Sequence, residues 1–231
     1  MKNPKILVSL LIGVIFLYTS FWYYTSGPTK FPTNTQVIEE MTNDFSVVST
    51  SVIQDKVFLD DHHVFVPFIA EDEMYGFSLW EWNNRKWHEV FVSTDGDIRV
   101  WKIDRKDPTT YRIVWNYPPQ EQVDYMKFYL VNKRGFQVID NEHIYEPSVQ
   151  LDQQIVLSEN LYGSMKLSKE WVSVINSLNI SRDATSYYFG WRAFDSSDKI
   201  THPEGNENGS SSRGGGTHIE FVHFIEEFEL E

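Results

Sequence analysis

Histidines are the side chains in this chain best suited to metal or acid–base chemistry. The sequence has 7 of them, and His62 and His63 are adjacent. In an extended strand neighbouring side chains point to opposite faces, so this pair cannot chelate one ion without a bend. The same alternation separates His218 from His223 on a predicted strand. We therefore predict no metal site and no cofactor at these histidines.

Acidic side chains cluster at residues 60–61, at residues 71–73 and at the carboxyl terminus. Oxygen ligands suit calcium, but no cluster has the alternating Asp/Asn pattern with a glycine and a distal Glu that forms a calcium loop. Two carboxylates across a sheet groove could also cleave glycosides, a chemistry that depends on a separation the sequence does not reveal. Solvated turns explain these charges more simply, and an enzyme with paired carboxylates stays an alternative.

The spacing closest to that of a nucleophilic enzyme is Ser196-Ser197-Asp198-Lys199, which contains the Ser-x-x-Lys pattern of penicillin-recognising acyl enzymes. The Ser-Asp-Asn and Lys-Thr-Gly tripeptides of those enzymes do not occur in this sequence. The absence of Cys excludes disulfides, thiolate metal sites and cysteine nucleophiles. We predict no catalytic residue, and the motifs favour a protein that is not an enzyme.

Aromatic side chains give the strongest remaining signal, with 8 Trp, 12 Tyr and 16 Phe. Most of these rings should fill a core. Trp80 and Trp82 share one face of a predicted strand, and Trp101 could lie across from them. If that face is exposed, its rings would suit a sugar polymer or a protein partner. These three tryptophans are the candidate ligand-binding residues.

From residue 45 onward, β-branched and aromatic runs alternate with turn residues at about ten-residue spacing, which is typical of an antiparallel sandwich or barrel. The predicted strands are 63–69, 74–82, 86–92, 97–103, 111–116, 123–132, 149–157, 187–194 and 217–228. A capped amphipathic helix is predicted at 168–178. Asn83-Asn84 and Asp95-Gly96 fit tight hairpin turns. Residues 205–216 are small and polar, and they predict a flexible loop.

Strand number and spacing resemble an immunoglobulin-like or fibronectin-like β-sandwich. The predicted fold class is therefore mainly β: an N-terminal transmembrane helix followed by an antiparallel β-sandwich-like domain with one or two short helices. A fold of this kind does not by itself imply a function.

Residues 6–24 carry no charge, and as a helix they would rise about 28 Å, close to the hydrocarbon thickness of a bilayer. Lys2 and Lys5 precede them, and aromatic residues close the far end, which predicts a cytoplasmic amino terminus. We expect a cytoplasmic stub (1–5), a transmembrane anchor (6–24) in the lipid bilayer, a juxtamembrane spacer with a short helix at 36–43 (25–44), and an extracytoplasmic β domain (45–231).

The net charge of −13 and a pI near 4.9 disfavour a nucleic-acid partner. Together these features predict a single-pass protein of a bacterial cell membrane whose β domain binds a protein partner or a cell-envelope polymer. One alternative is a membrane-anchored envelope hydrolase or transferase that uses paired carboxylates. Another is an accessory subunit whose helix packs in a larger membrane complex.

Overall fold

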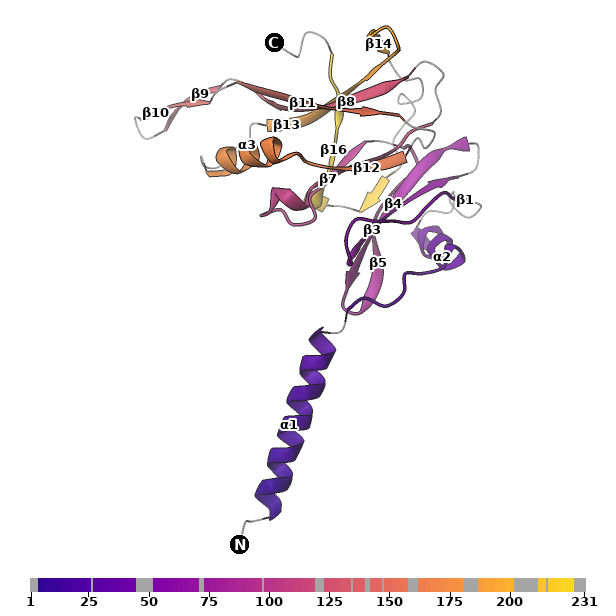
Figure 1. The fold of residues 1–231 in the computed structure, drawn as a ribbon, viewed down its shortest axis with the longest axis vertical. Helices are drawn as coiled ribbons and strands as arrows, with labels where there is room; N and C mark the ends of the chain where they lie inside the picture. The colour runs from indigo at the N-terminus through magenta and orange to yellow at the C-terminus, as the bar shows by residue number, and fades with distance from the viewer. Residues whose placement is uncertain are drawn as a thin grey trace.

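The chain is mainly β, with several antiparallel sheets and three α-helices (Figure 1). This confirms the predicted mainly β class. The computed structural model describes residues 4–25, 27–44, 52–70, 73–96, 98–118, 123–133, 135–139, 142–146, 148–157, 162–180, 187–201, 212–214 and 216–226. The helices are α1 (Pro4–Thr25), α2 (Asn34–Asp44) and α3 (Lys169–Ile180), with 3-10 turns η3 (Pro108–Thr110) and η4 (Gly216–His218).

Three sheets form the body of the protein. Sheet A contains β1 (Val52–Ile53), β2 (Val57–Phe58), β3 (His63–Ile69), β4 (Tyr75–Asn83), β5 (Lys86–Ser93) and β15 (Ser212–Gly214). Sheet B contains β12 (Tyr162–Lys166), β7 (Arg112–Asn116), β6 (Arg99–Trp101) and β16 (Ile219–Phe221). Sheet C contains β11 (Val149–Val156), β8 (Tyr125–Asn132), β13 (Tyr187–Phe194), β14 (Ile200–Thr201) and β17 (His223–Phe224). A separate hairpin joins β9 (Gly135–Ile139) to β10 (Glu142–Glu146).

Sheet B is the middle layer between sheets A and C (Figure 1). Ile113 and Trp115 of β7 pack toward sheet C, whereas Val114 packs with sheet A. Successive side chains of a strand point to opposite faces, so a strand with a sheet on each side buries both sets. All five residues of β7 are accordingly buried.

The outer face of sheet A is covered by the segment that the sequence assigns to a juxtamembrane spacer. Phe31, Val37 and Met41 are buried there together with Trp80. The helix α2 begins at Asn34, two residues before the predicted start, because Thr33 and Gln36 form a capping box. The Thr33 backbone N–H donates to Gln36 Oε1 at 2.9 Å.

The C-terminal segment connects all three sheets. β15 pairs with β5 of sheet A, β16 with β6 of sheet B, and β17 with β13 of sheet C. The strand predicted at 217–228 is therefore split between two sheets by the buried Val222, whose N–H donates to Ile98 O at 3.0 Å. Of the predicted loop 205–216, residues 205–211 and 215 lie outside the described residues, and β15 occupies part of the rest.

Several predicted boundaries match the structure closely. The strands at 63–69 and 187–194 have the predicted limits, and α3 begins after Ser168, whose Oγ accepts the Trp171 N–H at 3.3 Å. The first hairpin turn lies one residue later than predicted, because Asn84 and Arg85 have φ of 50° and 64°. Two successive positive φ values are typical of a type I′ turn.

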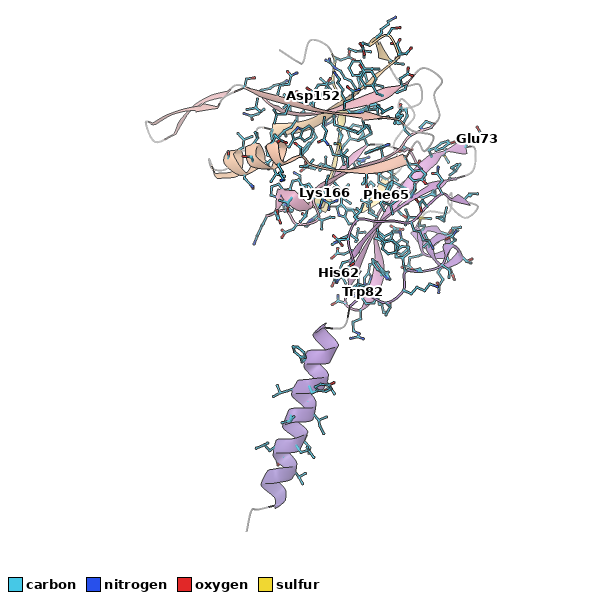
Figure 2. The ribbon with its side chains drawn as sticks, in the orientation of Figure 1. His62, Phe65, Glu73, Trp82, Asp152 and Lys166 are labelled. Carbon is cyan, nitrogen blue, oxygen red and sulfur yellow. The ribbon has the colours of Figure 1, made fainter. Side chains whose placement is uncertain are left out.

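The helix α1 extends away from the sheets (Figure 1) and has 22 residues. Its side chains are described from Val8 to Thr19 and at Phe21, and they stand clear of the rest of the protein (Figure 2). Among the residues whose side chains the structure describes, no helix with the length and apolar character needed to cross a membrane is found. The expected transmembrane helix at 6–24 is thus not found among them.

Candidate functional site

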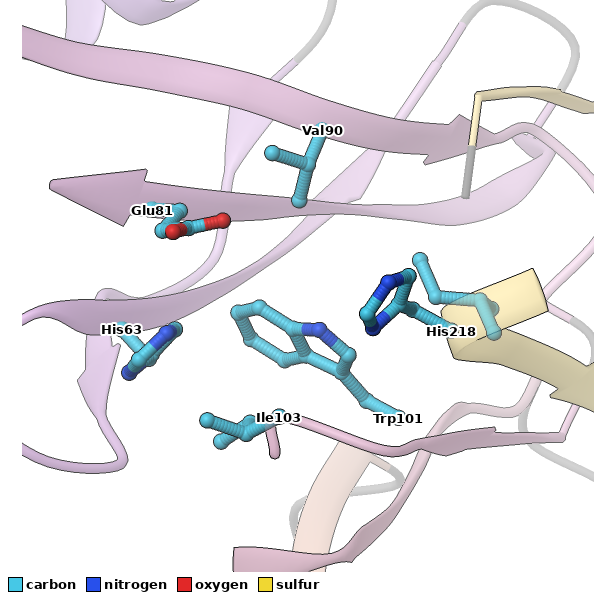
Figure 3. Close-up of a pocket in the computed structure, with 7 residues that line it drawn as sticks. His63, Glu81, Val90, Trp101, Ile103 and His218 are labelled. Atoms are coloured by element: carbon cyan, nitrogen blue, oxygen red, sulfur yellow. The ribbon is translucent and has the colours of Figure 1, made fainter. Parts of the chain in front are cut away.

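A cavity of about 430 Å³ lies where sheet A faces sheet B (Figure 3). Strands of sheet A form one side, and β6 with the C-terminal segment forms the other. Its lining combines two imidazoles and one carboxylate with aromatic and aliphatic groups: His63, Glu81, Val90, Trp101, Ile103, His218 and Ile219.

His63 begins β3 and is held in place by the turn before it. Its Nδ1 lies 2.8 Å and 3.0 Å from the two carboxylate oxygens of Asp60. Asp60 also accepts the backbone N–H of His62 at 2.8 Å. Burial raises the pKa of Asp60, but the hydrogen bonds from His62 and His63 outweigh this effect, so the pKa lies below its usual value. The His63 ring stands edge-on to Trp101, with ring centroids 5.2 Å apart.

His218 reaches the same cavity from the turn η4, on the opposite side of Trp101 from His63 (Figure 3). Its Nδ1 lies 3.3 Å from the carbonyl oxygen of Lys102, the residue that follows Trp101 in the chain. A carbonyl oxygen only accepts hydrogen bonds, so this contact requires a proton on Nδ1. In the neutral ring the Nε2 atom of His218 is then a hydrogen-bond acceptor.

Glu81 supplies the carboxylate of the lining. It is the direct cross-strand partner of His63, so the two side chains share the inner face of sheet A. Glu81 is half-buried, and its side chain makes no hydrogen bond or ion pair within the described part of the chain. A half-buried carboxylate without a counter-charge is costly unless water or a ligand solvates it.

The three candidate tryptophans are separated by sheet A. Trp101 is 3% exposed and forms a wall of the cavity. Trp80 is 1% exposed within the outer-face cluster, where its Nε1 donates to Ser78 Oγ, so it offers no surface to a partner. Trp82 is half-buried and packs against Trp87, with ring centroids 5.5 Å apart. One shared aromatic face is therefore not formed, since Trp101 belongs to the sheet behind the other two.

Sequence reasoning did not select His63, Glu81 or His218 as site residues. The pairing of His63 with Glu81 follows from the hairpin of β3 and β4, so alternation counted back from the turn could have found it. No local signal predicts His218, because it meets Lys102 across 116 residues of sequence.

Residues 195–199, which include the Ser-x-x-Lys pattern, form a turn. Asp195 accepts the backbone N–H groups of Ser197 and Lys199, so the Ser-x-x-Lys segment is used as a turn. Asp198 accepts a hydrogen bond from the Tyr125 hydroxyl, which raises the pKa of Tyr125 to about 12. Among the described residues, no group of three or more His, Asp or Glu side chains is placed to hold a metal ion.

No family model, curated protein or solved structure matches this chain. The chemistry of the cavity therefore follows from its own lining. Glu81 and the two imidazoles can accept hydrogen bonds, Trp101 provides an aromatic wall, and Val90, Ile103 and Ile219 provide apolar contacts. A concave site that combines apolar walls with a few polar groups is the usual form of a ligand site.

Proposed function

We propose that this protein is anchored in a cell membrane by α1 and presents its β layers outside the cytoplasm as a non-enzymatic binding module. The observation that carries the proposal is the surface of α1, where the large apolar side chains are 53–70% exposed. Covering such a side chain is worth about 1.5–3 kcal/mol, and lipid tails would cover all of them at once. The uncharged stretch continues beyond the described side chains, from Ile6 to Tyr24.

The orientation follows from the charges beside the helix. Lys2 and Lys5 precede the apolar stretch, and positive charge favours the cytoplasmic side. The sheets would then lie in the envelope of a bacterial cell, where a protein partner or an envelope polymer is within reach. Three packed layers of mainly antiparallel strands support the proposed sandwich-like architecture. Within this class, we propose an immunoglobulin-like or fibronectin-like sandwich.

The anchor is tested with the full chain in bacterial cells. Replacing Ile12 and Ile15 with lysine should release the protein from membranes washed with alkaline carbonate, because two charges at the helix centre oppose insertion. The matched control replaces Glu39 and Glu40, exposed on α2, with lysine. A C-terminal tag should be cleaved by protease added to intact cells. Release of the unchanged chain by carbonate, or a protected tag, would contradict the proposal.

The binding role is favoured over the hydrolase alternative by the carboxylates of the cavity. Glycoside hydrolysis generally uses two carboxyl groups that flank the scissile bond. Among the described residues that line the cavity, one, Glu81, has a carboxylate. We expect the full chain to bind an envelope component without releasing products from it. Turnover of an envelope polysaccharide that is lost in Glu81→Gln would overturn the binding role in favour of the enzyme.

A further inference from the structure

We infer that the cavity between sheets A and B binds an organic cation with N–H donors, that is, a guanidinium or a primary ammonium group. The inference depends on the proposed function, because it takes the cavity to be the ligand site and assigns its ligand class. Glu81, His63 and His218 would accept hydrogen bonds from the cation, and Trp101 would contact it as an aromatic wall.

The hydrogen-bonding directions of the two imidazoles point to a donor ligand. Nδ1 of His63 faces the Asp60 carboxylate and Nδ1 of His218 faces the Lys102 carbonyl oxygen. Both acceptors hold the proton on Nδ1, which leaves Nε2 of each neutral ring as an acceptor. A carboxylate and two such nitrogens around one cavity match a ligand that brings several N–H groups.

The charge of the site points the same way. Glu81 has no cationic partner within the described part of the chain, and the chain carries a net charge of −13. The nearby guanidinium of Arg99 lies over the rings of Phe91 and Phe221, at 5.5 Å and 4.8 Å, and is not part of the cavity lining. A ligand cation would therefore supply the counter-charge for Glu81.

The aromatic wall decides between a small cation and a sugar ring. A pyranose stacks on the open face of an aromatic side chain, but only 3% of Trp101 is exposed. The cation would instead bond to the polar groups of the lining, and the side chains of Val90 and Ile103 can contact an alkyl group attached to it. The volume of about 430 Å³ admits a guanidinium with its attached chain.

Calorimetric titration of the full chain in detergent micelles with methylguanidinium tests the assignment. We expect saturable binding that weakens about tenfold in Glu81→Gln, because that variant removes the charge and keeps the shape. Glu40→Gln on the exposed face of α2 is the matched control and should bind as the unchanged chain does. His218 lies in an exposed turn, and His218→Ala should weaken binding about threefold. This variant replaces Glu81→Gln as the test if Glu81→Gln does not fold.

Three further ligands separate failure of this inference from failure of the proposed binding role. Choline has the same charge without N–H donors and should bind more weakly than methylguanidinium. Choline, acetate or N-acetylglucosamine binding at least as tightly as methylguanidinium would overturn the cation assignment and leave the binding role in place. Unchanged binding by both Glu81→Gln and His218→Ala would also overturn it. Binding of none of the four ligands would overturn the cation assignment, and the binding role would fall with it only if the full chain also bound no envelope component.

The source of the cation is tested with an N-acetylated Gly-Arg-Gly amide peptide. Tighter binding of this peptide than of methylguanidinium supports an arginine side chain of a protein partner as the ligand. Equal binding supports a free small cation. Failure of the peptide to displace bound methylguanidinium would overturn an arginine side chain of a protein partner as the ligand and would support a free small cation.

Discussion

Sheet A carries aromatic side chains on both of its faces, and the two faces are covered in different ways. On the outer face, Trp80 and Phe68 are closed off by Phe31 and by α2. On the inner face, Phe65 and Phe77 pack against sheet B. The outer cover is one ring followed by a short helix, whereas the inner cover is a second sheet.

The nature of the cover determines where an opening is left. Phe31 inserts its ring between Trp80 and Trp87, at centroid distances of 5.6 Å and 5.0 Å, so the outer face is filled locally. Two twisted sheets match over their centres but diverge toward their edges. The cavity lies away from the centre of sheet A, at the strand ends where His63 begins β3 and Glu81 approaches the end of β4. Aromatic side chains thus form both the closed outer face of sheet A and one wall of the cavity.

The largest expected effect is on the closed face. Trp80→Ala removes a fully buried ring and should lower the free energy of unfolding by about 4 kcal/mol. Urea unfolding of the full chain in micelles, followed by near-ultraviolet circular dichroism, measures it; urea is used because guanidinium is the proposed ligand. A loss below about 1 kcal/mol would mean that the outer face is not the sealed core described.

A smaller effect is expected at Gly76, which lies beside Phe68 of the outer face. A methyl group at Gly76 would lie 2.5 Å from Ser93 O and 2.6 Å from the Phe68 ring. Gly76→Ala should therefore cost about 2 kcal/mol in the same unfolding measurement, because a backbone atom and a buried ring must both move. Gly27→Ala is the control, since nothing lies within 4 Å of its added methyl group. Equal stability of the two variants would contradict the close packing at Gly76.

The contrast between the faces also explains what the sequence could predict. The β-branched and aromatic pattern of β3 and β13 predicted both strands to the residue, because turn residues flank each of them in the sequence. It could not predict the role of Phe31, a single ring in a segment rich in Pro and Thr that reads as a spacer. Nor could it predict the middle layer, because burial of β7 on both faces depends on which sheets pack against it.

The candidate site was only partly predictable for the same reason. The sequence names Trp101 as a candidate because it could lie across from Trp80 and Trp82, whereas it lines the cavity on the other side of sheet A. Trp80 was selected by the same reasoning but is core, since the cover over its face comes from residues about fifty positions away in sequence. The position of His218 depends on the C-terminal segment returning to β6, a long-range pairing with no periodic signal.

Trp82→Ala compares two tryptophans on one face of β4. Trp82 is half-buried and packs on Trp87, beyond the part of the face that Phe31 and α2 cover completely. Its loss should lower the free energy of unfolding by about 1 kcal/mol, a fraction of the effect at Trp80. Urea unfolding of both variants in parallel measures the difference. A cost equal to that of Trp80→Ala would show that the outer face is sealed along its whole length.

The smallest effect is expected at the edge of the cavity, where Asp60 holds His63. Asp60→Asn should lower the free energy of unfolding by only about 0.5 kcal/mol, because solvent screens this pair, in which the Asp60 side chain is 43% exposed. The pKa of Asp60 is lowered by folding, so its carboxylate stabilises the fold above pH 3.8, and this contribution is lost as the pH falls through the lowered pKa. The difference between the two chains should therefore be present at pH 6 and shrink toward pH 3. A difference that grows on acidification would show that the carboxylate does not stabilise this edge, and the position of His63 in the cavity would need another cause.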